Sequence, residues 1–213
     1  SIRMMNCRLG YRALAIEAVL FCVAAGVSLA QSSSTADSHL LRSKHFDRVL
    51  IVVLENQNFE SAMKNEVFVK LASKGAVFSN FGNLYHHSYP NYLAMIAGSD
   101  FRAHNRWNSD AQLDFKDDAQ HRTIGDWLDW KNYAENYPAS PTGTKPFLES
   151  RKGKYARKHV PFLSFREVQT KSFRNVVGVD TRDTGNAFVT DIGRFVADPQ
   201  KHPLPRYMLY SPN

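Results

Sequence analysis

Short apolar runs alternate with segments of helical character along most of the chain. The run RVLIVVL at 48–54 is uninterrupted and β-branched, which is typical of a strand buried on both faces of a parallel sheet. Further strands are predicted at 76–78, 176–179 and 207–210, and helices at 66–73, 88–97, 123–130 and 187–196. Because strands alternate with helices, we expect an α/β fold with a largely parallel central sheet flanked by helices.

Two of the predicted helices have recognisable ends. In the first, Ser88 stands at the amino-terminal cap, Pro90 falls in the first turn and Gly98 ends the helix. In the second, Thr123-Ile-Gly-Asp126 resembles a capping box, with Asp in place of Glu, and leads a helix through Trp130. Trp127 and Trp130 are three residues apart, so on a helix they would share one face in the core.

The amino-terminal segment has the layout of a secretory signal peptide. Three arginines precede an apolar run at 13–29, and Ser28-Leu-Ala30 offers small residues for cleavage after Ala30. A single membrane anchor is the alternative, but the run is interrupted by Glu17 and is shorter than the ~20 apolar residues that a span needs. We therefore expect a secreted or periplasmic protein with a signal peptide at 1–30, a flexible leader at 31–45 and one domain at 46–213.

Composition narrows the chemistry that such an exported chain can use. The 213 residues are 43% hydrophobic and 22% charged, as in globular proteins. Both cysteines, Cys7 and Cys22, lie in the predicted signal peptide, so the mature chain would have no disulfide and no thiolate zinc site. Its formal charge would fall from +7 to about +5 and is dispersed, so nucleic acid is not an expected partner, and no stable membrane span would remain after cleavage.

Two polar segments are placed where an α/β sheet binds its ligands. Glu55 and Asn56 directly follow the first predicted strand, and the carboxyl ends of parallel strands are the usual binding edge. An acid next to an amide can supply oxygen ligands to a divalent cation, although a simple turn explains the same residues. Ser88 begins a helix, where free N–H groups and positive potential suit an alkoxide or a phosphate. The alternative for Ser88 is that it only caps the helix.

Together, the motif E-N-x-N-F at 55–59 and the motif S-x-P-N-Y-L-A-x-x-A-G at 88–98 resemble a family of phosphoesterases. This family contains acid phosphatases and bacterial phospholipases C and is similar to the wider alkaline-phosphatase-like superfamily. The resemblance continues through T-I-G-D at 123–126, W-K-x-Y-x-E at 130–135 and Y-A-R-K-H-x-P-F at 155–162. It spans roughly residues 47–213.

The resemblance implies a role for each matching residue. Glu55, Asn56 and Ser88 would bind a divalent metal ion of unknown identity, and Ser88 would be the nucleophile that forms a phosphoseryl intermediate. Asn105 would donate to a phosphate oxygen. His159 would contact the phosphate or protonate the leaving group.

Lys158 is predicted to bind substrate, and the alternative is a solvated lysine of a basic loop. The resemblance implies an exported phosphoesterase that hydrolyses phosphomonoesters. Two alternatives stay open: a phospholipase C-like enzyme acting on a phospholipid headgroup, and a phosphate-binding fragment without catalysis. The phosphate-binding alternative is considered because, in the family, an acid- and histidine-containing stretch follows this region and completes the metal site. No such stretch follows Tyr207 to Asn213 here. We therefore expect a fragment whose alkaline-phosphatase-like fold is incomplete at its carboxyl end.

Overall fold

The computed structural model describes residues 46–55, 57–101, 109–116, 119–138, 143–180 and 182–212. All of them lie in one compact unit, Arg42–Asn213. The predicted signal peptide at 1–30 and the predicted leader at 31–45 lie outside the described residues.

The described residues form helices, strands and short tight turns. The strands are β1 (Val49–Val52), β2 (Trp130–Glu135), β3 (Arg151–Lys152), β4 (Tyr155–Ala156), β5 (Val176–Val179) and β6 (Tyr207–Ser211). The helices are α2 (Phe59–Ala62), α3 (Glu66–Ala72), α4 (Ser88–Ala97) and α5 (Ala187–Ala197). A π-helical turn at Val168–Ser172 and 3-10 turns at Ile124–Asp126, Arg157–His159, Pro161–Ser164 and Phe173–Asn175 complete the elements.

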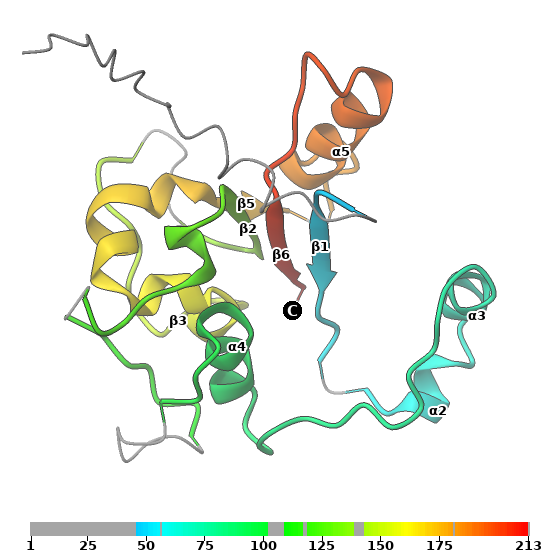
Figure 1. Ribbon diagram of the computed structural model, residues 1–213, viewed down its shortest axis with the longest axis horizontal. Helices are drawn as coiled ribbons and strands as arrows, with labels where there is room; N and C mark the ends of the chain where they lie inside the picture. Colours follow the sequence, from blue (N-terminus) through cyan, green and yellow to red (C-terminus); the bar gives the residue numbers. More distant parts are fainter. Residues whose placement is uncertain are drawn as a thin grey trace, which may run out of the picture. The chain divides into compact units, whose positions relative to one another are not determined.

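Four strands form a parallel sheet in the order β1-β6-β2-β5 (Figure 1). Val49 of β1 pairs with Tyr207 of β6, which also pairs with Trp130 of β2. The strands β3 and β4 form a separate antiparallel hairpin. The prediction of an α/β fold with a largely parallel sheet is therefore confirmed.

Side chains alternate between the two faces of this sheet and build a separate apolar cluster on each. On one face, Tyr207 and Leu209 pack with residues of α4 and of the turns at 157–175. On the other face, Met208 packs with Phe188 and further residues of α5. The sheet is thus the middle of three layers, with α4 on one side and α5 on the other (Figure 1).

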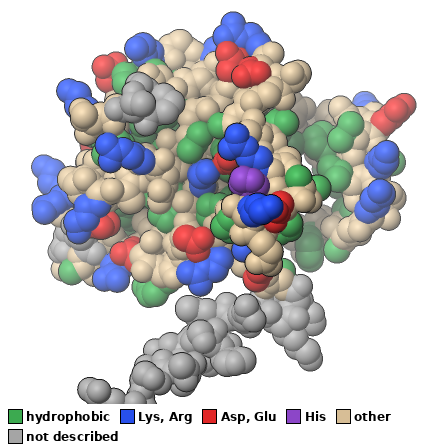
Figure 2. All heavy atoms as spheres, turned by 90° about the horizontal axis from the view of Figure 1, so that it is seen from above, with side chains coloured by type: hydrophobic (Ala, Val, Ile, Leu, Met, Phe, Trp, Pro, Cys, Tyr) green, Lys and Arg blue, Asp and Glu red, His purple; other side chains and the backbone are tan. Residues whose placement is uncertain are grey.

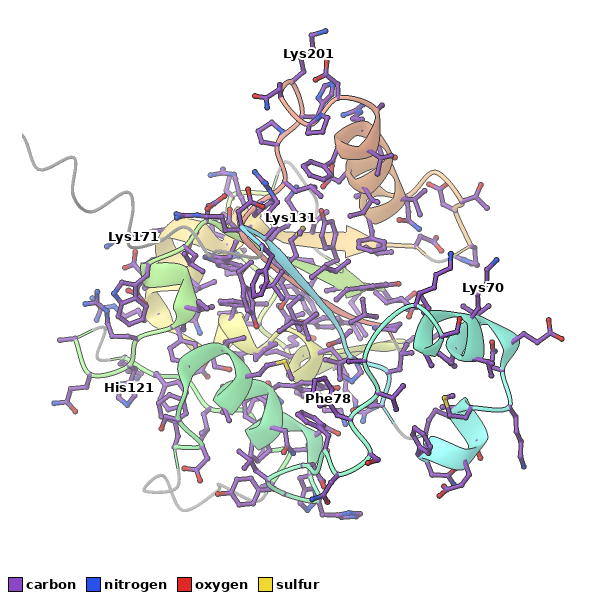
Figure 3. The ribbon with its side chains drawn as sticks, turned by 45° about the vertical axis from the view of Figure 1, so that its right-hand side comes forward. Lys70, Phe78, His121, Lys131, Lys171 and Lys201 are labelled. Atoms are coloured by element: carbon purple, nitrogen blue, oxygen red, sulfur yellow. The ribbon has the colours of Figure 1, made fainter. Side chains whose placement is uncertain are left out.

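Two strand predictions differ from the structure. The strand β1 is present, but within the described residues it lies at the edge of the sheet, and Val52 is 46% exposed instead of buried on both faces. No strand forms at 76–78, which belongs to the loop between α3 and α4. Phe78 on this loop is 77% exposed (labelled in Figure 3), so the apolar triplet marks an exposed segment and not a buried strand.

The predicted helix at 123–130 is also wrong beyond its first turn. The capping box of Thr123 and Asp126 is confirmed, but the 3-10 turn ends at Asp126 and β2 begins at Trp130. A Cβ at Gly125 would lie 2.4 Å from the Trp130 indole nitrogen, so the turn packs against this ring only because glycine has no side chain. Trp130 is buried and Trp127 is 60% exposed, so the two rings do not share a face.

Charged side chains of both signs are spread over the surface. The face in Figure 2 has Lys and Arg side chains at many separate places and no continuous basic stripe. Among the described residues, we find no helix whose length and hydropathy would allow it to cross a bilayer.

Candidate functional site

Three segments that are distant in sequence meet beyond the carboxyl end of β1. Glu55 follows β1 by three residues, Ser88 is the first residue of α4, and Lys158 and His159 lie in the 3-10 turn after β4. The Nε2 atom of His159 is 3.0 Å from Oε1 of Glu55. The structure therefore brings together four residues that the sequence singled out.

Glu55 is the centre of this cluster. Its Oε1 lies near His159 and, at 3.4 Å, near Nζ of Lys158, and its Oε2 accepts a hydrogen bond of 3.1 Å from the Tyr92 hydroxyl. Burial by itself raises the pKa of Glu55, but the hydrogen bond from Ser88 and the neighbouring His159 and Lys158 lower it by more, to about 2. Glu55 is therefore a carboxylate at any ordinary pH.

Tyr92 stays protonated beside this carboxylate. Burial raises the pKa of its hydroxyl, and the negative charge of Glu55 raises it further. The hydroxyl is thus a fixed donor that holds one oxygen of Glu55 in place. Tyr92 lies in the S-x-P-N-Y motif, but the motif alone did not indicate that this tyrosine faces Glu55.

Lys158 links the cluster to the candidate nucleophile. Its Nζ is 3.5 Å from the Ser88 hydroxyl and 3.3 Å from Oδ2 of Asp110. Its side chain is only 14% exposed, so the alternative of a solvated surface lysine is wrong. The ammonium places a positive charge directly beside Ser88.

Asp110 was missed by the sequence reasoning. Its Oδ1 accepts a 3.1 Å hydrogen bond from the backbone N–H of Tyr89, in the first turn of α4, while Oδ2 faces Lys158. The N-cap residue of α4 is His87, whose side chain makes no capping hydrogen bond. Asp110 therefore accepts a hydrogen bond from one of the N–H groups that have no partner within the helix. Asp110 is distant in sequence from α4, so no local motif predicts this contact.

Ser88 does not cap the helix that it begins. It is the first helical residue, with His87 at the cap, so the alternative that Ser88 serves only as an N-cap is wrong. At the other end, Gly98 adopts the left-handed conformation with φ of 64°, as its predicted role as helix terminator requires.

The loop before Ser88 is fastened by Asn91. The side-chain oxygen of Asn91 accepts hydrogen bonds from the N–H groups of Leu84 (2.8 Å) and Tyr85 (3.3 Å). Its amide nitrogen donates to the carbonyls of Tyr85 (2.9 Å) and His87 (2.6 Å). The asparagine of the S-x-P-N motif thus positions the backbone that leads into Ser88.

A metal ion does not fit the described residues by themselves. No group of three or more His, Cys, Asp or Glu side chains in the described part of the chain is placed to bind one. Both oxygens of Glu55 are already engaged, and the Lys158 ammonium lies between Glu55 and Ser88. Two further predicted site residues, Asn56 and Asn105, lie outside the described residues.

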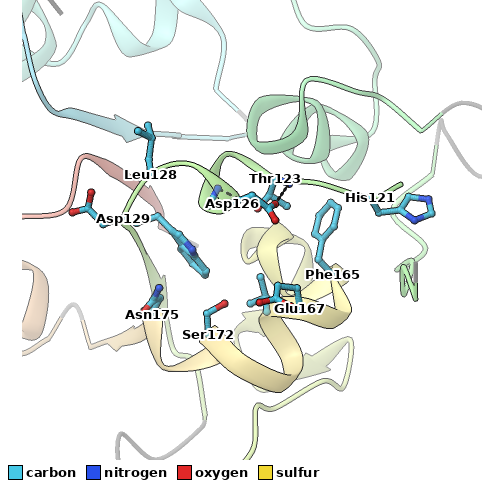
Figure 4. A pocket seen from close by; sticks show the side chains of 12 residues that line it. His121, Thr123, Asp126, Leu128, Asp129, Phe165, Glu167, Ser172 and Asn175 are labelled. Carbon is cyan, nitrogen blue, oxygen red and sulfur yellow. Dashed lines mark hydrogen bonds between the residues drawn. The ribbon is translucent and has the colours of Figure 1, made fainter. Parts of the chain in front are cut away.

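A second polar pocket, of about 310 Å³, contains none of the predicted site residues (Figure 4). Its acidic residues already have structural partners. Asp126 accepts from the backbone of Thr123, Glu167 pairs with Lys171 at 2.8 Å, and Asp129 pairs with Arg206. These carboxylates hold turns and strands together, so the pocket is a weaker candidate for chemistry than the cluster around Glu55.

Comparison with known proteins finds curated relatives at about 30% identity. A phosphate-repressible acid phosphatase of Penicillium chrysogenum is 32% identical over 173 residues, which cover 79% of this chain and 38% of that protein. An acid phosphatase of Aspergillus niger is 30% identical over 175 residues, with the same coverage. A phosphatidylinositol-3-phosphatase of Mycobacterium tuberculosis is 32% identical over 168 residues, which cover 75% of this chain and 52% of that protein.

The chain thus spans about 38% of the length of the two fungal relatives and about half of the mycobacterial one. No family model matches it. No solved structure matches it significantly.

Proposed function

From the premise that this chain is a member of the acid phosphatase family of phosphoesterases, we propose that it takes part in the hydrolysis of phosphate monoesters with Ser88 as nucleophile. The proposal rests on the groups that surround the Ser88 hydroxyl. It stands at the amino terminus of a ten-residue helix, forms a hydrogen bond with Glu55 and lies 3.5 Å from the Lys158 ammonium. Phosphoryl transfer depends chiefly on such positioning and on compensation of charge.

In the proposed first step, Oγ of Ser88 forms a bond to phosphorus while the bond between phosphorus and the ester oxygen breaks. The departing alcohol gains a proton and the serine loses one. The Lys158 ammonium and the helix terminus oppose the negative charge of the phosphoryl oxygens. In the second step, water attacks the phosphoseryl group, releases phosphate and restores the hydroxyl.

His159 and Glu55 hold each other in position within this site. Because the imidazole of His159 is 3.0 Å from Glu55, the ring is oriented by the carboxylate, and its role as a phosphate contact or leaving-group acid is part of the proposal. We also propose that Glu55, Asn56 and Ser88 bind a divalent metal ion and that Asn105 donates to a phosphate oxygen. The described residues alone do not make up a complete coordination shell.

The test is the hydrolysis of a chromogenic phosphate monoester by the wild-type chain and by the variant Ser88→Ala. We expect kcat to fall by at least about a hundredfold, as for loss of a nucleophile. The matched control is Ser99→Ala, just beyond the other end of α4, where the hydroxyl accepts a hydrogen bond from the N–H of Phe101 and lies outside the cluster around Glu55. Equal activity of Ser88→Ala and Ser99→Ala would refute the assignment of the nucleophile.

One observation favours a second candidate substrate, a phospholipid headgroup. The loop that leads from α3 to Ser88 exposes Phe78, Phe81 (87% exposed) and Leu84, and such apolar side chains can enter a bilayer interface. The relative from Mycobacterium tuberculosis is named a phosphatidylinositol-3-phosphatase. Phosphate release from phosphoinositide vesicles, compared with release from the soluble monoester, separates the two candidates.

Two further parts of the proposal have their own tests. Phosphate binding in calorimetry without turnover of any ester would favour the non-catalytic alternative. We also propose that residues 1–30 direct export of the chain. Fractionation of cells that express it, with and without this segment, measures that directly.

A further inference from the structure

A pocket of about 340 Å³ adjoins the cluster around Glu55 and shares two of its residues. Asp110 and Lys158 form the wall common to the site and to this pocket, which we name the leaving-group pocket. The remaining lining residues are Ala111, Gln112, Ser150, Arg151 and Ala156. Because Lys158 is 3.5 Å from the Ser88 hydroxyl and also lines this space, a phosphate ester held at Ser88 would lie beside the pocket, and 340 Å³ is within the range of small-ligand sites.

The leaving-group pocket contains a positively charged side chain, Arg151, that does not contribute to holding the fold together. The side chain of Arg151 forms no hydrogen bond or ion pair among the described residues, whereas the other charged lining residues, Lys158 and Asp110, pair with each other at 3.3 Å. Arg151 therefore leaves the pocket with one unpaired cation, and a planar guanidinium is well suited to bind a carboxylate or phosphate.

The same pocket contains an unused hydrogen-bond acceptor. The amide nitrogen of Gln112 donates to the backbone carbonyl of Asp110 at 3.1 Å, but the buried side-chain oxygen of Gln112 has no partner in the described part of the chain. Buried polar atoms are seldom left unpaired, and a rotation of the Gln112 side chain toward the pocket would let this oxygen accept a hydrogen bond from a ligand hydroxyl.

The wall that carries Arg151 is fixed to the catalytic segment. Arg151 belongs to β3, which pairs with β4, and β4 runs directly into the turn of Lys158. The N–H of Arg157 donates to the carbonyl of Ser150 at 3.0 Å, and the buried guanidinium of Arg157 donates to the carbonyl of Leu148 at 2.9 Å. The hairpin and Lys158 thus form one connected unit, so Arg151 has a defined position relative to Ser88.

We propose that the leaving-group pocket selects phosphate monoesters whose alcohol carries a hydroxyl and a second negative charge, with Arg151 binding the charge and Gln112 the hydroxyl. This inference rests on the proposed function, because it assigns the alcohol side of the same reaction. It predicts a preference for small phosphorylated hydroxy acids over neutral phosphorylated polyols.

The experiment compares 3-phosphoglycerate with glycerol 3-phosphate, which have the same carbon skeleton and differ in a carboxylate against a hydroxymethyl group. For the wild-type chain we expect kcat/KM to be about tenfold higher for 3-phosphoglycerate, as for one charge-assisted hydrogen-bonded pair. The variant Arg151→Gln should abolish this ratio, mainly through KM. The matched control is Lys152→Gln, on the same hairpin but outside the leaving-group pocket, which should keep the ratio.

A second variant and a binding measurement complete the test. Gln112→Leu should lower kcat/KM about fivefold for both esters alike, because both carry the same central hydroxyl. Calorimetric titration of both esters into the Ser88→Ala protein measures selection without turnover, and 3-phosphoglycerate should bind more tightly only while Arg151 is present. Equal binding of the two esters, or a ratio unchanged in Arg151→Gln, would overturn the inference. Loss of activity on every ester, with selective binding retained, would overturn the proposed function instead.

Discussion

Helices α3 and α4 have similarly apolar sequences, but the chain holds them in different ways. Helix α4 buries Tyr89, Tyr92, Leu93 and Ile96 against the sheet layer, and the Tyr89 hydroxyl is 2.5 Å from that of Ser164. Helix α3 buries none of its residues, and Leu71 is one of several apolar side chains that it exposes. The difference indicates that the position of Ser88 depends on a packed core, whereas α3 depends on its own local capping.

The largest expected effect separates these two regions by stability. Phe162 is fully buried under α4 and stacks on Trp130 with 3.8 Å between ring centroids. Phe162→Ala should lower the free energy of unfolding by about 3–5 kcal/mol, through lost burial and the remaining cavity. Phe78→Ala, on the exposed loop after α3, should change it by less than about 0.5 kcal/mol. Urea unfolding measures both, and equal losses would remove the contrast.

A second prediction concerns pH. The pKa of Glu55 is 4.5 in its ordinary state and about 2 in the folded chain, so the carboxylate stabilises the fold above about pH 4.5. This contribution, of the order of a few kcal/mol, should be lost as the pH falls from about 4.5 toward 2. Glu55→Gln should therefore flatten the dependence of unfolding free energy on pH in that window. Glu66→Gln, on α3, is the control and should leave the dependence as it is in the wild type.

A smaller effect is expected from the loop in front of Ser88. Asn91→Ala removes the four hydrogen bonds that the Asn91 side chain makes to residues 84–87, and should cost about 1–3 kcal/mol of stability. Activity on a chromogenic phosphate should fall further than stability explains, because Ser88 loses its fixed approach. An unchanged kcat in a folded Asn91→Ala protein would show that the packed core alone positions Ser88.

The smallest effect should be confined to α3. The side-chain oxygen of Asn65 caps this helix by accepting from the N–H of Val67 at 2.9 Å. Asn65→Ala should cost about 0.5–1 kcal/mol of local helix stability, seen as faster hydrogen exchange at Val67. Global unfolding and catalysis should not change. A loss of activity would instead couple α3 to the site and weaken the comparison with α4.

Local signals predicted those parts of the fold that local residues determine. The strands around Val49, Val176 and Tyr207 and the helix Ser88–Ala97 form where their patterns indicate. The central strand β2 was not predicted: its first residue, Trp130, was assigned to the end of a helix because of the helix-like cap before it, and the polar sequence WKNYAE gave no strand signal. Its strand conformation comes from pairing with β5 and β6, which lie far away in sequence.

The same distinction between local and long-range signals applies to the residues of the candidate site. Glu55, Ser88 and His159 lie in motifs with recognisable spacing, so the sequence could single them out before any contact was known. Asp110 and Tyr92 could not be found in this way, because their importance comes from contacts across the fold with Lys158, the α4 backbone and Glu55. Motifs locate the candidate reacting groups, and the tertiary structure selects the residues that contact them.

The strand order has a consequence for how the chain acquires this site during synthesis. Among the residues that the structure describes, β1 pairs with β6 alone, so within that part of the chain Val49 gains its strand neighbour only when Tyr207 has been made. Contacts this distant in sequence form slowly, and an unpaired apolar strand is prone to associate with other chains in the meantime. Glu55 follows that same strand, so the cluster around Glu55 should assemble late, and conditions that slow β6 docking should favour aggregation over folding.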